Sequence, residues 1–195
     1  MTQYAAPLEG APKTPWWNLS FTAKLLMCLD EGPCQIADIY CREGQAAVTL
    51  LPHRAQASYV GIAREADRVQ IASANAAALG ERASFREGKP DKVPLPDACV
   101  DVVLCLRALS GVSDTAKVFD EAFRILRPGG RLIAVEPDGI SETFYFDDHL
   151  VGFNASYKWL CKRADDLITA GATDQNHWTA PGLSLGPTLA VRMQM

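Results

Sequence analysis

The sequence has few of the patterns that mark metal-binding, disulfide-bonded or membrane proteins. Its six cysteines include no C-x-x-C pair and its three histidines lie far apart, so neither a metal site nor a disulfide framework is predicted. Cysteines inside apolar runs, such as Cys105, are typical of free thiols in a cytoplasmic protein. No apolar run approaches the roughly 20 residues of a membrane span, and the first residues lack the features of a signal peptide.

An excess of positive charge is also missing. The net charge of −4 argues against a nucleic-acid partner held by bulk charge, although a local basic patch stays open. Only 22% of the residues are charged and 48% are hydrophobic, which indicates a folded chain with a full core. A length of 195 residues suits one compact domain.

The chain divides into an arm at residues 1–17 and a domain at residues 18–195. The arm is rich in proline and ends in Trp16 and Trp17. Two tryptophans after a polar arm predict an apolar landing site, either on the domain or on a partner. A homo-oligomer or a hetero-oligomer is therefore possible, and the sequence does not decide between them.

Strand and helix patterns alternate through the domain. Predicted strands lie near 35–40, 58–63, 83–88, 100–106 and 131–136, and predicted helices near 20–30, 44–53, 64–80 and 114–130. A further helix is predicted near 153–171 and two strands near 173–180 and 187–194. The central strands are apolar on both faces, which favours a parallel sheet covered by helices. The short turn before 187–194 predicts an antiparallel last strand.

Two stretches resemble the class I S-adenosylmethionine-dependent methyltransferases. "VPLPDACVDVVLCLRAL" is similar to that family's fourth-strand region, and "VFDEAFRILRPGGRLIAVEP" to its helix and fifth strand. The resemblance covers residues 18–195. It implies a doubly wound, Rossmann-like α/β fold with a seven-stranded, mostly parallel sheet and an antiparallel C-terminal strand.

The resemblance also places the cofactor site, and this chain departs from the family at several positions. The family ends its first strand with an acid followed by Gly-x-Gly-x-Gly; here Asp38 is the acid, and Tyr40, Arg42 and Gly44 occupy the glycine positions. Glycines in such a turn allow positive φ and close approach of the ligand. Two large side chains there predict a changed pocket, although Gly44 alone could serve helix packing.

Two further acids of the family are replaced. Ala63 stands where an acid would bind both ribose hydroxyls, and Lys89 where an aspartate would accept from the adenine amine, with Asp91 two residues on as a substitute. Arg64 adds positive charge, which disfavours a sulfonium cation and favours an anion. The cofactor-binding positions that the resemblance implies are listed together as Asp38, Tyr40, Arg42, Gly44, Ala63, Arg64, Gly88, Lys89 and Leu106.

Catalytic residues are sparsely marked. Groups at strand ends that could act near a substrate are Arg107, Glu136, Asp138 and His149, and His149 is the candidate catalytic base. Two leading hypotheses follow from the resemblance, beside a third in which a fold-sharing enzyme of different chemistry binds an anionic ligand. One is a methyltransferase that acts on a small molecule and binds S-adenosylmethionine weakly. The other is a catalytically silent binding or assembly subunit that has lost the cofactor and serves a partner protein.

Overall fold

The computed structural model describes residues 17, 19–109, 112–137, 173–182 and 186–194. The helices are α1 (Leu19–Met27), α2 (Gln45–Leu50), α3 (Ala66–Asn75) and α4 (Thr115–Ile125), with short 3-10 segments η1 (Leu51–His53) and η2 (Ala77–Arg82). The strands are β1 (Cys34–Asp38), β2 (Ala57–Ala63), β3 (Ala83–Glu87), β4 (Val100–Leu106), β5 (Leu126–Pro137), β6 (Thr173–Gly182) and β7 (Gly186–Gln194).

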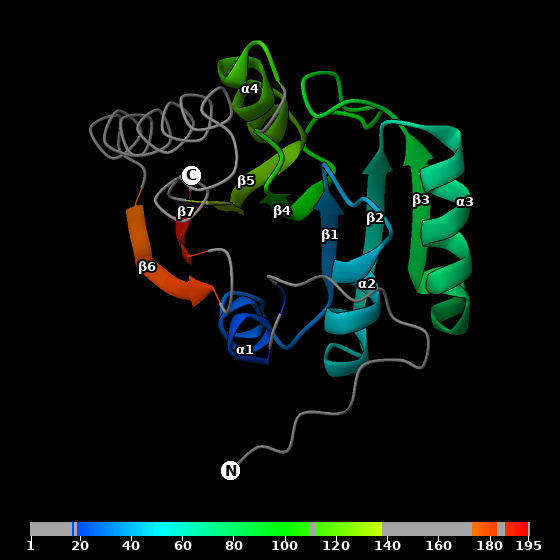
Figure 1. Cartoon of the computed structure of the whole chain (residues 1–195), viewed down its shortest axis with the longest axis horizontal. Coiled ribbons are helices and arrows are strands. Elements are labelled where there is room, and N and C mark those ends of the chain that lie inside the picture. Colours follow the sequence, from blue (N-terminus) through cyan, green and yellow to red (C-terminus); the bar gives the residue numbers. More distant parts are fainter. Residues whose placement is uncertain (1–16, 18, 110–111, 138–172, 183–185, 195) are drawn as a thin grey trace.

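Five of these strands form the parallel part of the sheet, in the order β3-β2-β1-β4-β5 (Figure 1). The register pairs Asp38 at the end of β1 with Gly61 of β2 and Leu104 of β4. The chain order therefore reverses between β1 and β4, and ligands of such sheets bind beyond the strand ends at this point. The predicted parallel α/β sheet is confirmed for these strands.

Beyond β5 the sheet continues with β7 and then β6. Strand β7 runs antiparallel to β5, with Ala134 opposite Val191, and antiparallel to β6. The connection between β6 and β7 is too short for a parallel crossover.

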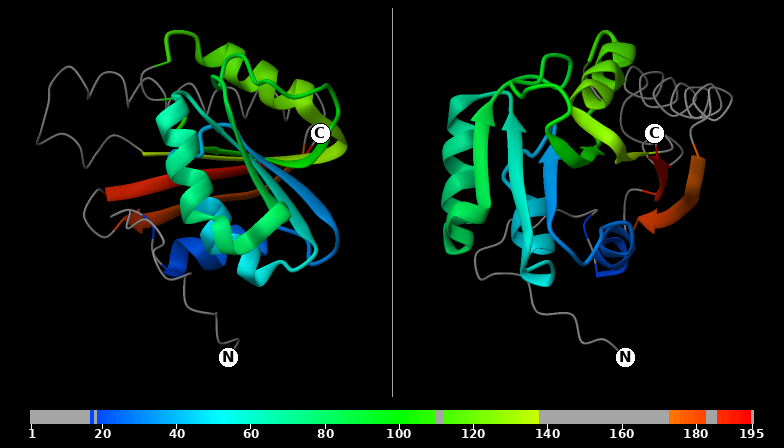
Figure 2. Two further views of the ribbon diagram at one scale, coloured as in Figure 1. Left: turned by 90° about the vertical axis from the view of Figure 1, so that its right-hand side faces the viewer. Right: turned by 180° about the vertical axis from the view of Figure 1, so that it is seen from behind.

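Helices cover both faces of the sheet. Figure 2 shows α4 on the side of the sheet opposite α1 and α2. One core cluster joins α1, α2 and α3 to alternate strand residues such as Val102 and Leu104, and the other joins α4 to their neighbours Val103 and Cys105. Burial on both faces explains the apolar run from Val102 to Leu106 in β4.

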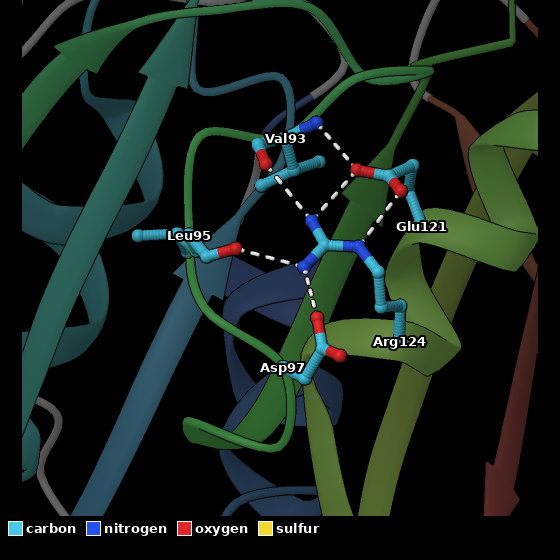
Figure 3. A network of polar contacts seen from close by, with 5 residues as sticks. All are labelled: Val93, Leu95, Asp97, Glu121 and Arg124. Carbon is cyan, nitrogen blue, oxygen red and sulfur yellow. Dashed lines mark hydrogen bonds and ion pairs between the residues drawn. The ribbon is translucent and has the colours of Figure 1, made fainter.

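Arg124 of α4 fixes the loop that leads into β4 (Figure 3). Its guanidinium pairs with both oxygens of Glu121, at 2.8 Å each, and with Asp97 at 2.7 Å. It also donates to the carbonyl oxygens of Val93 and Leu95, at 2.9 Å each. All five N–H donors of the arginine are thus used. The bond to Glu121 is the main cause that holds the pKa of Glu121 below its usual value.

The predicted arm at residues 1–17 lies outside the described residues except for Trp17. The Trp17 indole N–H donates to the Thr22 hydroxyl at 2.8 Å, and its ring meets the Phe21 ring edge-on at 5.0 Å. Trp17 therefore packs against the start of α1, on the core that α1 shares with the sheet. The predicted helix near 153–171 lies outside the described residues.

Candidate functional site

The turn between β1 and α2, residues 39–44, lies at the carboxyl end of the central strands. Its backbone is tied to the neighbouring strands, because the Ile39 amide donates to the Leu104 carbonyl at 3.0 Å and the Cys41 amide to the Ile62 carbonyl at 2.9 Å. The Gly44 amide closes the turn on the Cys41 carbonyl at 2.8 Å. The turn is thus held at the point where the chain order of the sheet reverses.

Two residues of this turn have left-handed backbones. Gly44 has a φ of 78° and Arg42 a φ of 51°. A non-glycine residue in this region costs about 1–2 kcal/mol, and such strain often marks a functional turn. At Gly44 the close packing adds a second constraint, because a Cβ would lie 3.2 Å from the Phe85 ring and 3.3 Å from the Ala72 carbonyl oxygen.

Asp38 is buried beneath the turn, with 2% of its surface exposed. One carboxylate oxygen accepts the Tyr40 amide at 3.0 Å and the other accepts the Tyr59 hydroxyl at 2.9 Å. Burial raises the pKa of Asp38 to about 6, against the lowering effects of these two hydrogen bonds and of the Arg42 charge. Both oxygens are therefore engaged by groups of the chain itself.

The Tyr40 ring brings two arginines together at the ends of β1 and β2. The guanidinium carbons of Arg42 and Arg64 each lie 5.2 Å from the centre of this ring. Such distances allow cation–π attraction. The ring is partly buried against the α4 side of the sheet, where Ile62 and Leu95 also pack. The Tyr40 ring thus packs against the core, and the two guanidinium groups over it make the surface there positively charged.

The end of β2 is closed by the backbone. The Ala63 side chain is buried, with 2% exposed, and its carbonyl oxygen accepts the Gly88 amide at 2.8 Å. Gly88 has no room for a side chain, because a Cβ there would lie 2.6 Å from Pro94. Lys89 beyond it is exposed, in a turn that the Lys92 amide closes on the Lys89 carbonyl at 3.0 Å.

At the end of β4, Leu106 is buried in the core and Arg107 follows it, 8% exposed. Arg107 has a φ of 54°, and its amide donates to the Val135 carbonyl at 2.7 Å. The two strands between which the chain order reverses, β1 and β4, are therefore each followed by an arginine with a left-handed backbone, Arg42 and Arg107.

Comparison with known proteins shows what kind of site this is. A family model described as a methyltransferase domain matches residues 37–134, half of the chain. The chain belongs to the S-adenosylmethionine-dependent methyltransferase family.

The chain is similar to curated methyltransferases and to solved methyltransferase structures. A demethylmenaquinone methyltransferase of Thermus thermophilus is 31% identical over 137 residues, 66% of this chain and 62% of that protein. An S-adenosylmethionine-dependent methyltransferase of Mesorhizobium loti has the same fold, with a TM-score of 0.66 at 19% identity, over 90% of this chain and 97% of that one. This chain spans 62%, 48% and 35% of the lengths of three curated relatives.

A further solved structure contains a methyltransferase-fold chain together with a partner. It is described as a complex of a Haloferax volcanii methyltransferase activator, and the likeness has a TM-score of 0.66 at 19% identity, over 89% of this chain and 88% of that one. At this identity the likeness establishes the fold only.

The turn between β1 and α2 has a left-handed φ at position 42 although the residue there is arginine. Tyr40 joins Asp38 through its backbone amide and Arg42 and Arg64 through its ring, and Gly44 closes the same turn. Among the described residues, no hydrogen bond, ion pair or ring contact joins Lys89 to this group. His149 and Asp138 lie outside the described residues, and the structure describes only the backbone of Glu136.

Sequence reasoning missed two features of this methyltransferase site. The first is Tyr59, a residue with no motif of its own, whose hydroxyl engages Asp38. The second is the left-handed backbone of Arg107. The alternation of β2 places Tyr59 on the same face as Ile36 and Val102, but only the register of β1 on β2 brings its hydroxyl to Asp38.

Metal and membrane features are absent from the described part of the chain. No three histidine, cysteine or carboxylate side chains there are grouped so that they could hold a metal ion. No helix among the described residues has both the length and the apolar character needed to cross a bilayer. The five cysteines of the described part of the chain are free thiols, as the sequence predicts.

Replacing Asp38 by asparagine should stabilise the protein at neutral pH. The raised pKa means that the folded protein holds a proton between about pH 4 and pH 6 that the unfolded chain has lost. The free energy of unfolding therefore falls as the pH rises through this range and levels off above it. Asparagine can still accept from the Tyr40 amide and donate to Tyr59, so we expect a gain of about 1–2 kcal/mol at pH 7.5 and little at pH 4.

Denaturant unfolding at both pH values tests this expectation. Tyr59→Phe is the matched control, since it removes a donor to the carboxylate and should lower stability more at pH 7.5 than at pH 4. Equal stability changes at the two pH values for Asp38→Asn would show that the carboxyl group titrates normally.

Proposed function

We propose that this chain is a small-molecule methyltransferase whose own site binds S-adenosylmethionine weakly. The observation that carries the proposal is Ala63, a buried methyl side chain where the family holds the ribose with an acid. Its carbonyl oxygen already accepts the Gly88 amide, so the residue offers a ribose diol no charged acceptor and only the second lone pair of that oxygen. The family membership supplies the reaction class, and the site supplies the low affinity.

Three contacts with the cofactor are affected. The ribose acid is replaced by Ala63, the adenine acid by Lys89, and close backbone approach is hindered by Tyr40 and Arg42. A charge-assisted hydrogen bond contributes roughly 1.5–3 kcal/mol. Losses at separate contacts add approximately, so a micromolar site becomes about millimolar. The residues present therefore do not fit the cofactor as the family binds it, and no methyl-transfer step is assigned to them.

The acceptor we propose is a small molecule, the class named for the Thermus relative. His149 is the proposed base near the acceptor. We also propose that the site is carried by a seven-stranded, mostly parallel sheet in which the C-terminal strand β7 is antiparallel. We place the protein in the cytoplasm because of its free thiols, and without a nucleic-acid partner because of its net charge of −4.

A second candidate function is a catalytically silent binding or assembly subunit. The pair Arg42 and Arg64 on Tyr40 favours it, because two positive charges at the cofactor turn oppose a sulfonium. In the solved complex with a methyltransferase activator, a chain of the same fold associates with another protein. On this hypothesis the oligomeric state is part of the function, as a homo-oligomer or with a different partner.

Isothermal titration of the full chain with S-adenosylmethionine tests the weak-binding proposal. We expect a dissociation constant of about 1 mM, since the three changes together cost about 4 kcal/mol. A constant in the low micromolar range would refute the proposal. Methyl transfer to any small acceptor at high cofactor concentration would favour the enzyme, and its absence at saturation would favour the silent subunit.

A further inference from the structure

The pair of arginines on Tyr40 forms a concentrated positive charge at the ends of two neighbouring parallel strands. Arg42 follows β1 and Arg64 follows β2, whose carboxyl ends lie side by side in Figure 1. Both guanidinium carbons are 5.2 Å from the same ring centre, so the ring sets the position of both charges. We call Tyr40, Arg42 and Arg64 the arginine pair site.

The charges of Arg42 and Arg64 are only partly balanced within the described part of the chain, where the Arg42 charge acts on the buried Asp38 carboxyl and lowers its pKa. No ion pair involves Arg42 or Arg64 there, and the acids next to Arg42 are engaged elsewhere. Asp38 is buried and bonded to Tyr59, and Glu43 pairs with Arg68 at 2.6 Å. Two exposed acids lie near Arg64. Glu65 follows it in the chain and its side chain does not cap α3, and Glu87 of β3 is paired with Ala63.

The other polar groups at this site are donors as well. In the turn at residues 39–44, the amides of Arg42 and Glu43 have no hydrogen-bond partner among the described residues. Ala63 offers no charged acceptor, since its side chain is a methyl group, and its carbonyl oxygen already accepts the Gly88 amide. A ligand held here meets N–H groups and positive charge, which is the environment of an anion.

We propose that the arginine pair site binds the phosphate of a phosphorylated ribose, so that the chain takes a nucleoside phosphate. A neutral ribose diol is bound best by a carboxylate at the end of β2, and position 63 holds alanine instead. In dinucleotide-binding sheets an arginine near this strand end accommodates a ribose 2′-phosphate where an acid would bind the diol. Guanidinium groups bind phosphate through two parallel hydrogen bonds, which suits this exchange. The inference concerns a ligand class beyond the proposed methyltransferase function.

Titration of the full chain with adenosine 2′-monophosphate, adenosine 5′-monophosphate, adenosine and inorganic phosphate tests this inference. We expect adenosine 2′-monophosphate to bind at least about tenfold more tightly than adenosine and than inorganic phosphate, since both parts of the ligand contribute. Equal affinities for adenosine 2′-monophosphate and adenosine would overturn the phosphate site. Inorganic phosphate binding as tightly as the nucleotide would overturn the nucleoside part, and tighter binding of the 5′-phosphate would overturn its placement.

Variants of the pair identify the residues. Arg42→Gln and Arg64→Gln should each weaken binding of adenosine 2′-monophosphate about tenfold or more while binding of adenosine stays unchanged. Lys117→Gln removes one positive charge from an exposed side chain of α4 and is the matched control, with no change expected. Glu65→Gln should tighten binding, because it removes a negative charge beside Arg64. Circular dichroism confirms that each variant is folded, and unchanged nucleotide affinity in a folded Arg42→Gln, Arg64→Gln double variant would overturn the inference.

The nucleotide titration and the test of the proposed function give independent results. Binding of S-adenosylmethionine is measured on the same preparation, and it can be weak or tight whichever way the nucleotide titration turns out. S-adenosylhomocysteine lacks the sulfonium charge, so the arginine pair site predicts that it binds more tightly than S-adenosylmethionine. The reverse order would show that the two arginines do not act on the bound ligand.

Discussion

Arg124→Ala should lower the free energy of unfolding by about 3–4 kcal/mol, the largest loss of stability expected for one polar side chain here. The guanidinium donates all five of its N–H groups, to Glu121, to Asp97 and to the carbonyl oxygens of Val93 and Leu95 (Figure 3). Alanine leaves these acceptors, several of them partly buried, without a partner. The loop into β4 then loses its attachment to α4, and urea unfolding followed by circular dichroism measures the loss.

Two control variants separate the geometry of this network from its charge. Arg124→Lys keeps the charge but cannot make the two-pronged pair with Glu121, so an intermediate loss is expected. Lys117→Ala removes a pair with Asp114 on the same helix at 3.5 Å, whose side chains are 67% and 44% exposed, and should change stability by less than about 0.5 kcal/mol. A loss for Arg124→Ala as small as that for Lys117→Ala would contradict the structural role of the network.

The second large effect is expected from restoring the family residues at the cofactor site. A variant with Tyr40→Gly, Arg42→Gly, Ala63→Asp and Lys89→Asp should bind S-adenosylmethionine about 10²–10³-fold more tightly than the parent chain. The turn is suited to the change at position 42, because its φ of 51° is one that glycine adopts without strain. Tyr40→Gly removes a ring that packs on the core, so part of the stability gained at position 42 is lost again.

Titration calorimetry on the folded variant measures this gain. The same variant with Ala63→Asn in place of Ala63→Asp is the matched control, since it has nearly the shape of the acid without its charge. We expect the control to recover only part of the affinity. If the restored variant folds and its affinity does not rise, the equivalence of these four positions with the family motif is wrong.

The backbone of the turn is fixed by its own hydrogen bonds and not by the side chain at position 42. Arg42 has a left-handed backbone that its side chain disfavours, because the bonds of Ile39, Cys41 and Gly44 hold the turn from both sides. The side chains differ in the room they have, since Ala63 is buried and Tyr40 packs on the core, whereas Arg42 is exposed. Substitution at position 42 can therefore change the charge of this surface without a change of fold.

The sequence by itself determined the parallel part of the fold. Apolar strands alternating with helical patterns leave few arrangements, because strands that are apolar on both faces need helices on both sides. The resemblance also predicts that Tyr40, Arg42, Ala63 and Lys89 stand at cofactor positions, because the family motif has a fixed spacing along the chain. Local patterns of this kind depend on neighbours in sequence and can be recognised without coordinates.

The tertiary structure decided which of these residues lie together. Arg64 lies 22 residues after Arg42, and the register of β1 on β2 brings both to one ring, whereas no hydrogen bond, ion pair or ring contact among the described residues joins Lys89 to them. The burial of Asp38 and its bond to Tyr59 also depend on strands that pair across the sheet. Contacts of this kind form between residues that are distant along the chain, so the spacing of one motif does not encode them. The sequence predicts Arg42, Arg64 and Lys89 at one pocket, and sheet pairing is the physical reason that Arg42 and Arg64 share a ring.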